Sequence, residues 1–149
     1  MENFVRVNMS NGTVAQDTLP DKYRTFGNRG LVAKVLTEEV EPACDPLAEG
    51  NKLVFALGML AGTGFPTGNR LSVGAKSPLT GGIKEANSGG NIGTLLARHA
   101  IKLIIVEGKP SGKGAYVLWI QADGQPKLIK ADDYTGLGAY ALVEKLKSV

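Results

Sequence analysis

The residues best suited to bind a ligand lie in the glycine-rich middle of the chain. Ten of the twenty glycines fall between Gly58 and Gly93, and the segment Asn87-Ser88-Gly89-Gly90 directly precedes a run with helical spacing over residues 91–100. The first N–H groups of a helix are unpaired and lie at the positive end of its dipole, so this segment is predicted to bind an anion. Its glycines let a ligand approach the backbone because they carry no Cβ.

Arg70 is a second candidate for the same chemistry. It begins an alternating run, 70–76, directly after a glycine-rich loop, 58–69, where its guanidinium can pair with a phosphate. Each feature also has a purely structural interpretation. Asn87 or Ser88 can simply cap the helix, with the glycines needed only for tight packing, and Arg70 can be a solvated or structural residue. On these residues alone, both interpretations stay open.

Other kinds of site are excluded by what the sequence lacks. Gly112-Lys113-Gly114 has neither the Ser or Thr nor the earlier glycine of a P-loop, and Gly62-Thr63-Gly64 is not followed by the third glycine of a dinucleotide site. Cys44 and His99 are the only cysteine and the only histidine. This chain alone therefore cannot build a cysteine-rich or multi-histidine metal site.

Composition and charge indicate a folded globular domain. The 149 residues are 43% hydrophobic and 21% charged, and the net charge of +3 is too weak to indicate a nucleic-acid partner. No stretch approaches the ~18 apolar residues of a membrane span. No apolar segment follows Met1–Val7 as it would in a signal peptide. Since a single cysteine cannot form an internal disulfide, we expect a cytoplasmic protein with no membrane partner.

The spacing of apolar residues predicts short strands joined mainly by tight turns. Asn11-Gly12 and Asp123-Gly124 each mark a hairpin. Hairpins favour an α+β fold, with antiparallel or mixed sheets and a few packed helices, over a doubly wound parallel sheet. Strands are predicted over residues 4–8, 13–18, 52–57, 70–76, 102–106, 115–121 and 127–130, and helices near Pro20 and over 29–39, 91–100 and 138–147.

Several segments together resemble the N-terminal domain of the tungsten-containing aldehyde ferredoxin oxidoreductase family. Each segment is a weak signal by itself, but their order and spacing are specific and extend over nearly all of residues 1–149. The matching segments are Val5-Arg6-Val7-Asn8 with Asn11-Gly12, Gly27-Asn28-Arg29-Gly30-Leu31, Asp45-Pro46-Leu47 with Asn51-Lys52-Leu53, Gly58 through Gly62, Pro66-Thr67-Gly68-Asn69-Arg70, Lys76-Ser77-Pro78-Leu79-Thr80-Gly81-Gly82, Ala86-Asn87-Ser88-Gly89-Gly90 and Ile104-Ile105-Val106-Glu107-Gly108-Lys109.

The resemblance implies a fold, a cofactor and a site. The family's enzymes oxidise aldehydes to carboxylic acids and pass electrons to ferredoxin, and this domain is part of a duplicated α+β unit beneath a tungsten, or molybdenum, bis-pterin. The resemblance implies that Arg70, Asn87, Ser88, Gly89 and Gly90 contact one pterin and its phosphate. It also implies that the backbone carbonyl of Asn87 helps to hold a magnesium ion between the two pterin phosphates.

Some parts of the family's enzymes have no counterpart in these residues. The second half of the duplicated unit and the helical domains that form the substrate pocket lie beyond Val149 in the family pattern. One cysteine also cannot replace the four ligands of the family's [4Fe–4S] cluster, so we expect no iron–sulfur cluster on this chain.

Two functions are therefore expected from the sequence. The first is the pterin-binding domain of an aldehyde oxidoreductase, inactive alone and completed by the remaining domains or another subunit. Ferredoxin would then be reached only through the complete enzyme. The alternative is a non-catalytic binding or assembly protein in which a homodimer restores the duplicated pair.

Overall fold

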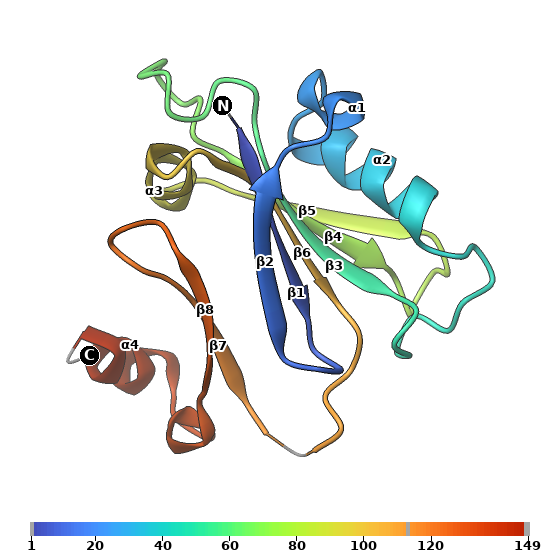
Figure 1. The fold of residues 1–149 in the computed structure, drawn as a ribbon, viewed down its shortest axis with the longest axis vertical. Helices are drawn as coiled ribbons and strands as arrows, with labels where there is room; N and C mark the ends of the chain where they lie inside the picture. Colours follow the sequence, from blue (N-terminus) through green and yellow to red (C-terminus); the bar gives the residue numbers. More distant parts are fainter. Residues whose placement is uncertain (1, 113, 148–149) are drawn as a thin grey trace.

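A six-stranded mixed sheet forms the centre of the fold (Figure 1). The computed structural model describes residues 2–112 and 114–147. The strand order is β2-β1-β6-β3-β4-β5; β1 and β6 are parallel and the other neighbours are antiparallel. A separate hairpin pairs β7 with β8. The elements are β1 (Asn3–Asn8), β2 (Thr13–Thr18), α1 (Asp21–Arg24), α2 (Asn28–Glu39), β3 (Lys52–Leu57), β4 (Leu71–Lys76), β5 (Ile83–Ser88), α3 (Ile92–Arg98), β6 (Ile101–Glu107), β7 (Tyr116–Ile120), β8 (Pro126–Lys130), a 3₁₀ turn (Asp132–Tyr134) and α4 (Ala139–Lys147).

This architecture confirms the predicted α+β class. Within the described residues the chain forms eight strands and four α-helices, and the predicted elements lie close to the observed ones. Both predicted hairpin turns place glycine at positive φ, 72° at Gly12 and 85° at Gly124, a conformation that glycine adopts without a steric penalty. The apolar pattern does not predict β5 (Ile83–Ser88).

The unpredicted strand β5 changes the expected position of Asn87 and Ser88. Both residues end β5, so they belong to a strand and not to the start of a helix. β5 pairs only with β4 at the edge of the sheet, and all but one of its residues are exposed. Such a strand needs no apolar alternation, which removes the usual signal. The turn over residues 77–82, closed by the Ser77 N–H to Gly82 O hydrogen bond of 2.8 Å, was the available sign of a returning strand.

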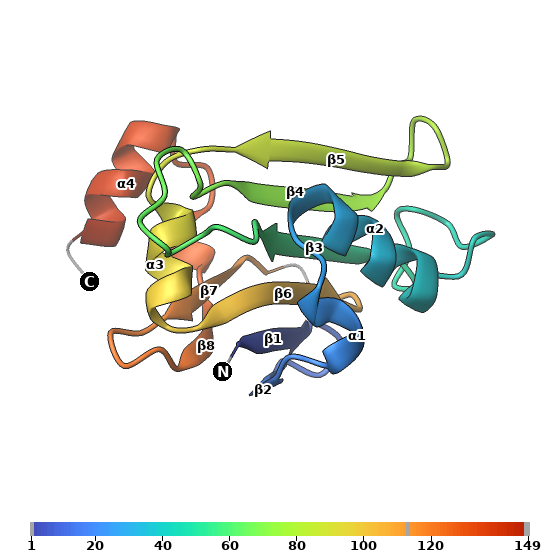
Figure 2. The same cartoon turned by 90° about the horizontal axis from the view of Figure 1, so that it is seen from above.

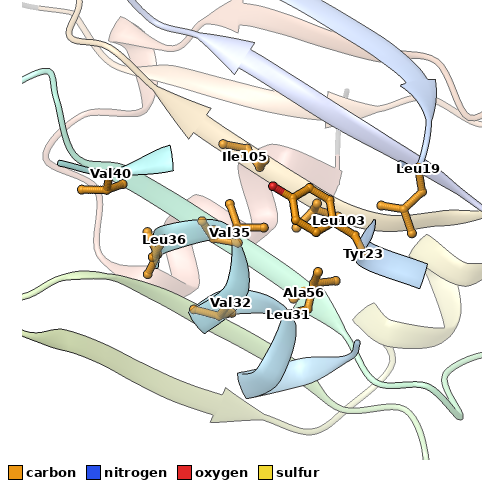
Figure 3. Close-up of a cluster of buried hydrophobic side chains, with 11 residues drawn as sticks. Leu19, Tyr23, Leu31, Val32, Val35, Leu36, Val40, Ala56, Leu103 and Ile105 are labelled. Carbon is orange, nitrogen blue, oxygen red and sulfur yellow. The ribbon is translucent and has the colours of Figure 1, made fainter. Parts of the chain in front are cut away.

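Helices α1 and α2 cover one face of the sheet (Figure 3). The apolar residues of α2 recur at positions 31, 32, 35 and 36, so they form a single stripe, and all four are buried. This packing anchors α2 and places Asn28 and Arg29, its first two residues, at one end of the sheet. The stripe belongs to a cluster that includes Val54 and Ala56 of β3 and Leu103 and Ile105 of β6.

Tyr23 of α1 gives this core a measurable pH dependence. The residue is 2% exposed, and its hydroxyl donates to Glu39 Oε1 over 3.0 Å. Burial, together with the Glu39 carboxylate, raises the pKa of Tyr23 to about 12. The unfolded chain releases this proton near pH 10 and the folded protein near pH 12, so stability falls across that window.

We therefore expect the wild type to lose up to about 2–3 kcal/mol more unfolding free energy than Tyr23→Phe between pH 9 and pH 12. Urea unfolding at each pH measures the difference. Parallel pH profiles of the unfolding free energy for the two proteins would show that folding does not raise the pKa of Tyr23.

The opposite face of the sheet is only partly covered. Leu96 of α3 is buried there together with Val5, Leu57 and Leu71, and the β7–β8 hairpin packs against the same cluster. Leu95 of α3 is nevertheless 52% exposed. α4 buries none of its residues and lies at the edge of the molecule in Figure 1. This face therefore presents apolar surface to its surroundings.

Hydropathy adds one further observation about the helices. Across residues 2–112 and 114–147, no helix is both long enough and apolar enough to cross a membrane.

Candidate functional site

The predicted site residues lie at one end of the sheet, where several chain segments meet. In the register of the sheet, Leu57 at the end of β3 pairs with Leu71 at the start of β4, and Leu71 pairs with Ser88 at the end of β5. The loop over residues 58–70 and the turn over 89–91 therefore leave the sheet at the same end. Figure 2 shows this loop beside α3.

Arg70 and Asn87 are in direct contact. The guanidinium Nε of Arg70 donates to Oδ1 of Asn87, and Nδ2 of Asn87 donates to Ser72 Oγ over 3.0 Å. Among the described residues, no other hydrogen bond or ion pair is made by the guanidinium of Arg70, which is exposed. The structure thus brings together two of the predicted residues and leaves the Nη nitrogens of Arg70 able to donate to an anion.

The two glycines that follow leave room beside this guanidinium. A Cβ added to Gly89 would lie 3.6 Å from Arg70 Nη1, so the guanidinium lies on the side of Gly89 where a side chain would otherwise stand. Gly90 has a φ of 99°, and a Cβ added there would meet nothing within 4 Å. Arg70, Asn87, Gly89 and Gly90 therefore form one exposed corner of the molecule, which we call the Arg70 corner.

Ser88 does not join the Arg70 corner through its side chain. Successive side chains of a strand point to opposite faces, so Ser88 lies on the face opposite to Asn87. Its register partner Leu71 belongs to the apolar cluster of that opposite face. The Ser88 hydroxyl donates to the carbonyl of Gly89 over 3.2 Å.

The expected helix start requires a second correction. α3 begins at Ile92 after Asn91, and no side chain caps it, so neither Asn87 nor Ser88 is an N-cap. α3 has only seven residues, which makes its dipole a weak source of anion affinity. The positive charge for an anion at this place therefore comes from Arg70.

Asn28 contacts the backbone of the Arg70 corner, and it was not predicted as a site residue. Its Nδ2 donates to the backbone carbonyl of Arg70 over 3.0 Å. Asn28 has a φ of 46°, a left-handed conformation that asparagine tolerates better than most residues. A Cβ on Gly58 would lie 2.4 Å from Asn28 Oδ1, so this contact requires glycine at 58. The pair Gly27-Asn28 at the start of a helix was the available sequence signal.

Glu85 and Ser72 extend the hydrogen bonds away from the corner. Ser72 Oγ donates to Glu85 Oε1 over 2.5 Å, and Arg29 Nε donates to Glu85 Oε2 over 3.1 Å. The hydrogen bond from Ser72, together with Arg29, holds the pKa of the Glu85 carboxyl below its usual value. Glu85 is therefore ionised at neutral pH. Because β5 was not predicted, sequence reasoning could not place Glu85 beside Ser72.

Part of the glycine excess serves packing between the loop and α3. A Cβ on Gly93 would lie 2.8 Å from the carbonyl oxygen of Asn69, and one on Gly62 would lie 2.6 Å from Ala97 Cβ. Asn69 Oδ1 also accepts the Gly62 N–H over 2.9 Å. These glycines allow α3 to approach the 58–70 loop closely, so Gly62 and Gly93 serve packing.

The charged side chains of Arg6, Glu39, Lys52 and Glu107 form a network away from the Arg70 corner. Arg6 donates to Glu39 and Glu107 over 2.9 and 2.8 Å, and Lys52 also pairs with Glu107, so these charges neutralise one another. No three His, Cys, Asp or Glu side chains in the described part of the chain are grouped so that they could hold a metal ion. A cation at the Arg70 corner would thus be held by backbone carbonyls and by ligands that do not come from this protein, such as phosphate oxygens or water.

Comparison with known proteins finds one matching family and several similar proteins. The family described as aldehyde ferredoxin oxidoreductase, N-terminal domain, matches residues 4–149. The tungsten-containing aldehyde ferredoxin oxidoreductase of Pyrococcus furiosus is 44% identical over 108 residues, which are 71% of this chain and 18% of that protein. The protein of the same name from Thermococcus kodakarensis is 42% identical over 116 residues, or 76% of this chain and 19% of that protein.

A solved structure has a similar fold. It is the active site complex BamBC of benzoyl coenzyme A reductase in complex with 1,5-dienoyl-CoA, with a TM-score of 0.86 and 25% sequence identity over 98% of this chain and 22% of that chain. The chain spans about a fifth of the length of the curated relatives it matches. Since the family match covers nearly the whole sequence, the chain belongs to the aldehyde ferredoxin oxidoreductase family and corresponds to its N-terminal domain.

Proposed function

We propose that this chain binds a tungsten pterin through the pterin phosphate, as the N-terminal domain of an aldehyde oxidoreductase. The observation that supports this most strongly is the arrangement of Arg70. Asn87 Oδ1 accepts from its Nε, while Nη1 lies beside Gly89 and neither Nη nitrogen has a partner among the described residues. A planar pair of donors suits phosphate oxygens, and the charge makes these hydrogen bonds strong.

The residues of the Arg70 corner suit both polar parts of such a cofactor. Gly89 and Gly90 leave the backbone open to a phosphate, since Gly90 has no neighbour where a Cβ would stand. Magnesium prefers oxygen ligands, and the backbone carbonyl of Asn87 supplies one. We assign Ser88 a backbone contact only, because its hydroxyl lies on the other face. When bound, the tungsten pterin supplies the redox chemistry of aldehyde oxidation.

The complete reaction requires polypeptide besides the residues described here. In this proposal the chain binds and orients one pterin, and other domains or a partner subunit provide the iron–sulfur cluster, the aldehyde pocket and the route to ferredoxin. We therefore expect no aldehyde oxidation by the chain alone. The single, half-buried and free Cys44 suits a reducing compartment, and we propose that the protein acts in the cytoplasm.

A homodimeric binding or assembly protein is a second candidate, favoured by the uncovered apolar surface. Tyr140 of α4 is 92% exposed, and Val143 and Leu146 on the same helix are also exposed. In the first proposal the remaining domains or subunit cover this surface, whereas in the second a copy of the chain does. Sedimentation of the purified chain separates the two, because a folded monomer at high concentration excludes the homodimer.

The proposed function is tested by analysing the chain purified from cells grown with tungstate. We expect tungsten and pterin fluorescence to copurify with the chain in a constant ratio, with magnesium present. Molybdenum in place of tungsten would change the metal but keep the pterin site. A folded chain that carries neither metal nor pterin, and forms a stable dimer, would favour the second candidate.

A further inference from the structure

We propose that Glu85 is a positioning residue that orients Arg70 toward phosphate, acting through Ser72 and Asn87; this inference rests on the proposed function. Glu85 does not contact Arg70, although its carboxylate also accepts a hydrogen bond from the side chain of Asn87. It lies at the far end of a line of hydrogen bonds that runs from Arg70 to Asn87, then to Ser72, then to Glu85.

The charge of Glu85 sets the direction of every hydrogen bond in this line. A carboxylate can only accept, so the single proton of the Ser72 hydroxyl is donated to Glu85 Oε1 over 2.5 Å. Ser72 Oγ can then only accept, and it does so from Asn87 Nδ2 over 3.0 Å. The amide of Asn87 is therefore turned with its Oδ1 toward Arg70, where it accepts from Nε.

Burial keeps water away from the Ser72–Glu85 end of the line, whereas Asn87 and Arg70 at the other end are exposed. Ser72 is fully buried, and the side chain of Glu85 is 10% exposed. Arg29 binds the second oxygen of Glu85, but it is 80% exposed and contributes little by itself. Buried hydrogen bonds reinforce one another and are costly to leave unmade. Arg70 is thus held by its Nε, with Nη1 against Gly89 and available to a phosphate.

The substitution Glu85→Gln distinguishes positioning from simple charge effects by its sign. Removing a negative charge near an anion strengthens anion binding by Coulomb's law. In the proposed line the result is the opposite. A glutamine amide can donate to Ser72, whose proton then turns to Asn87. Asn87 reverses its amide and presents Nδ2 to Arg70 Nε, so that two donors face each other and Arg70 turns away.

The experiment titrates the purified chain with inorganic phosphate in the presence of magnesium. We expect Glu85→Gln and Ser72→Ala each to weaken binding about three- to tenfold. The control Glu144→Gln removes the same charge on exposed α4 and should stay within twofold. In an Arg70→Ala background, Glu85→Gln should have no further effect. The Arg70 Nε–H signal in ¹⁵N NMR should shift in Glu85→Gln and in Ser72→Ala.

The outcomes separate this inference from the proposed function. A wild type that shows no saturable phosphate binding overturns the proposed function and, with it, this role. If the wild type binds, but Glu85→Gln binds equally or more tightly and the Arg70 Nε–H signal does not move, only the role of Glu85 is overturned. Ser72→Ala breaks the same line without changing the charge, so it decides the matter if Glu85→Gln fails to fold.

Discussion

Replacing Arg70 with alanine is expected to weaken pterin phosphate binding about 10- to 100-fold. The substitution removes the charged donors of the Arg70 corner, and hydrogen bonds to charged groups are the strongest of their kind. The side chain is exposed, so the free energy of unfolding should change by no more than about 0.5 kcal/mol. Pterin and tungsten content of the purified variant measures the loss, and urea unfolding verifies the fold.

Arg98→Ala is the matched control for this prediction. Arg98 lies in the last turn of the neighbouring α3 and is exposed, so the variant changes the net charge by the same amount. Equal losses in the two variants would point to a general charge effect. Full pterin content in Arg70→Ala would place the phosphate elsewhere on the chain.

The largest expected effect on stability is that of Leu31→Ala. Leu31 has no exposed surface and lies in the stripe by which α2 packs on the sheet. Truncating a fully buried leucine removes its contacts and leaves a cavity, which costs about 2–5 kcal/mol. We expect a corresponding fall in the urea midpoint. α2 also carries Asn28, which binds the carbonyl of Arg70, so loosening the helix should disturb the Arg70 corner as well.

Leu79→Ala controls for the chemical change itself. Leu79 is 91% exposed in the turn before β5, and its side chain has little to lose. The unfolding free energy of Leu79→Ala should match that of the wild type within about 0.5 kcal/mol. A loss below about 1 kcal/mol in Leu31→Ala would mean that the sheet and α2 close the cavity by moving together.

The elements that were predicted correctly are those whose own residues carry the signal. β1 and β2 alternate and are joined by a turn that needs positive φ, which Gly12 provides. α2 shows the helical stripe, and β6 is a run of apolar residues in the middle of the sheet. In each case burial selects residues with a period that can be read locally.

The candidate site was predicted only in part, for a related physical reason. Arg70, Gly89 and Gly90 were named from their types and from the family resemblance, and they do lie together with Asn87. Their supports were not named. Asn28 reaches Arg70 across 42 positions of the sequence, and Ser72 reaches Glu85 across 13. Hydrogen bonds between side chains so far apart leave no periodic pattern in the sequence.

The fold class, most of the strands and helices, and the family of this protein follow from its residues alone, because they depend on local periodicity, turn residues and ordered motifs. Which side chains lie together at the Arg70 corner depends on the tertiary structure. The pairing of the edge strand β5 with β4 places Asn87 opposite Ser72, moves Ser88 to the other face and brings Glu85 into line with Arg70. The register of a polar edge strand is set by pairing with its neighbour, and its own residues do not specify that register.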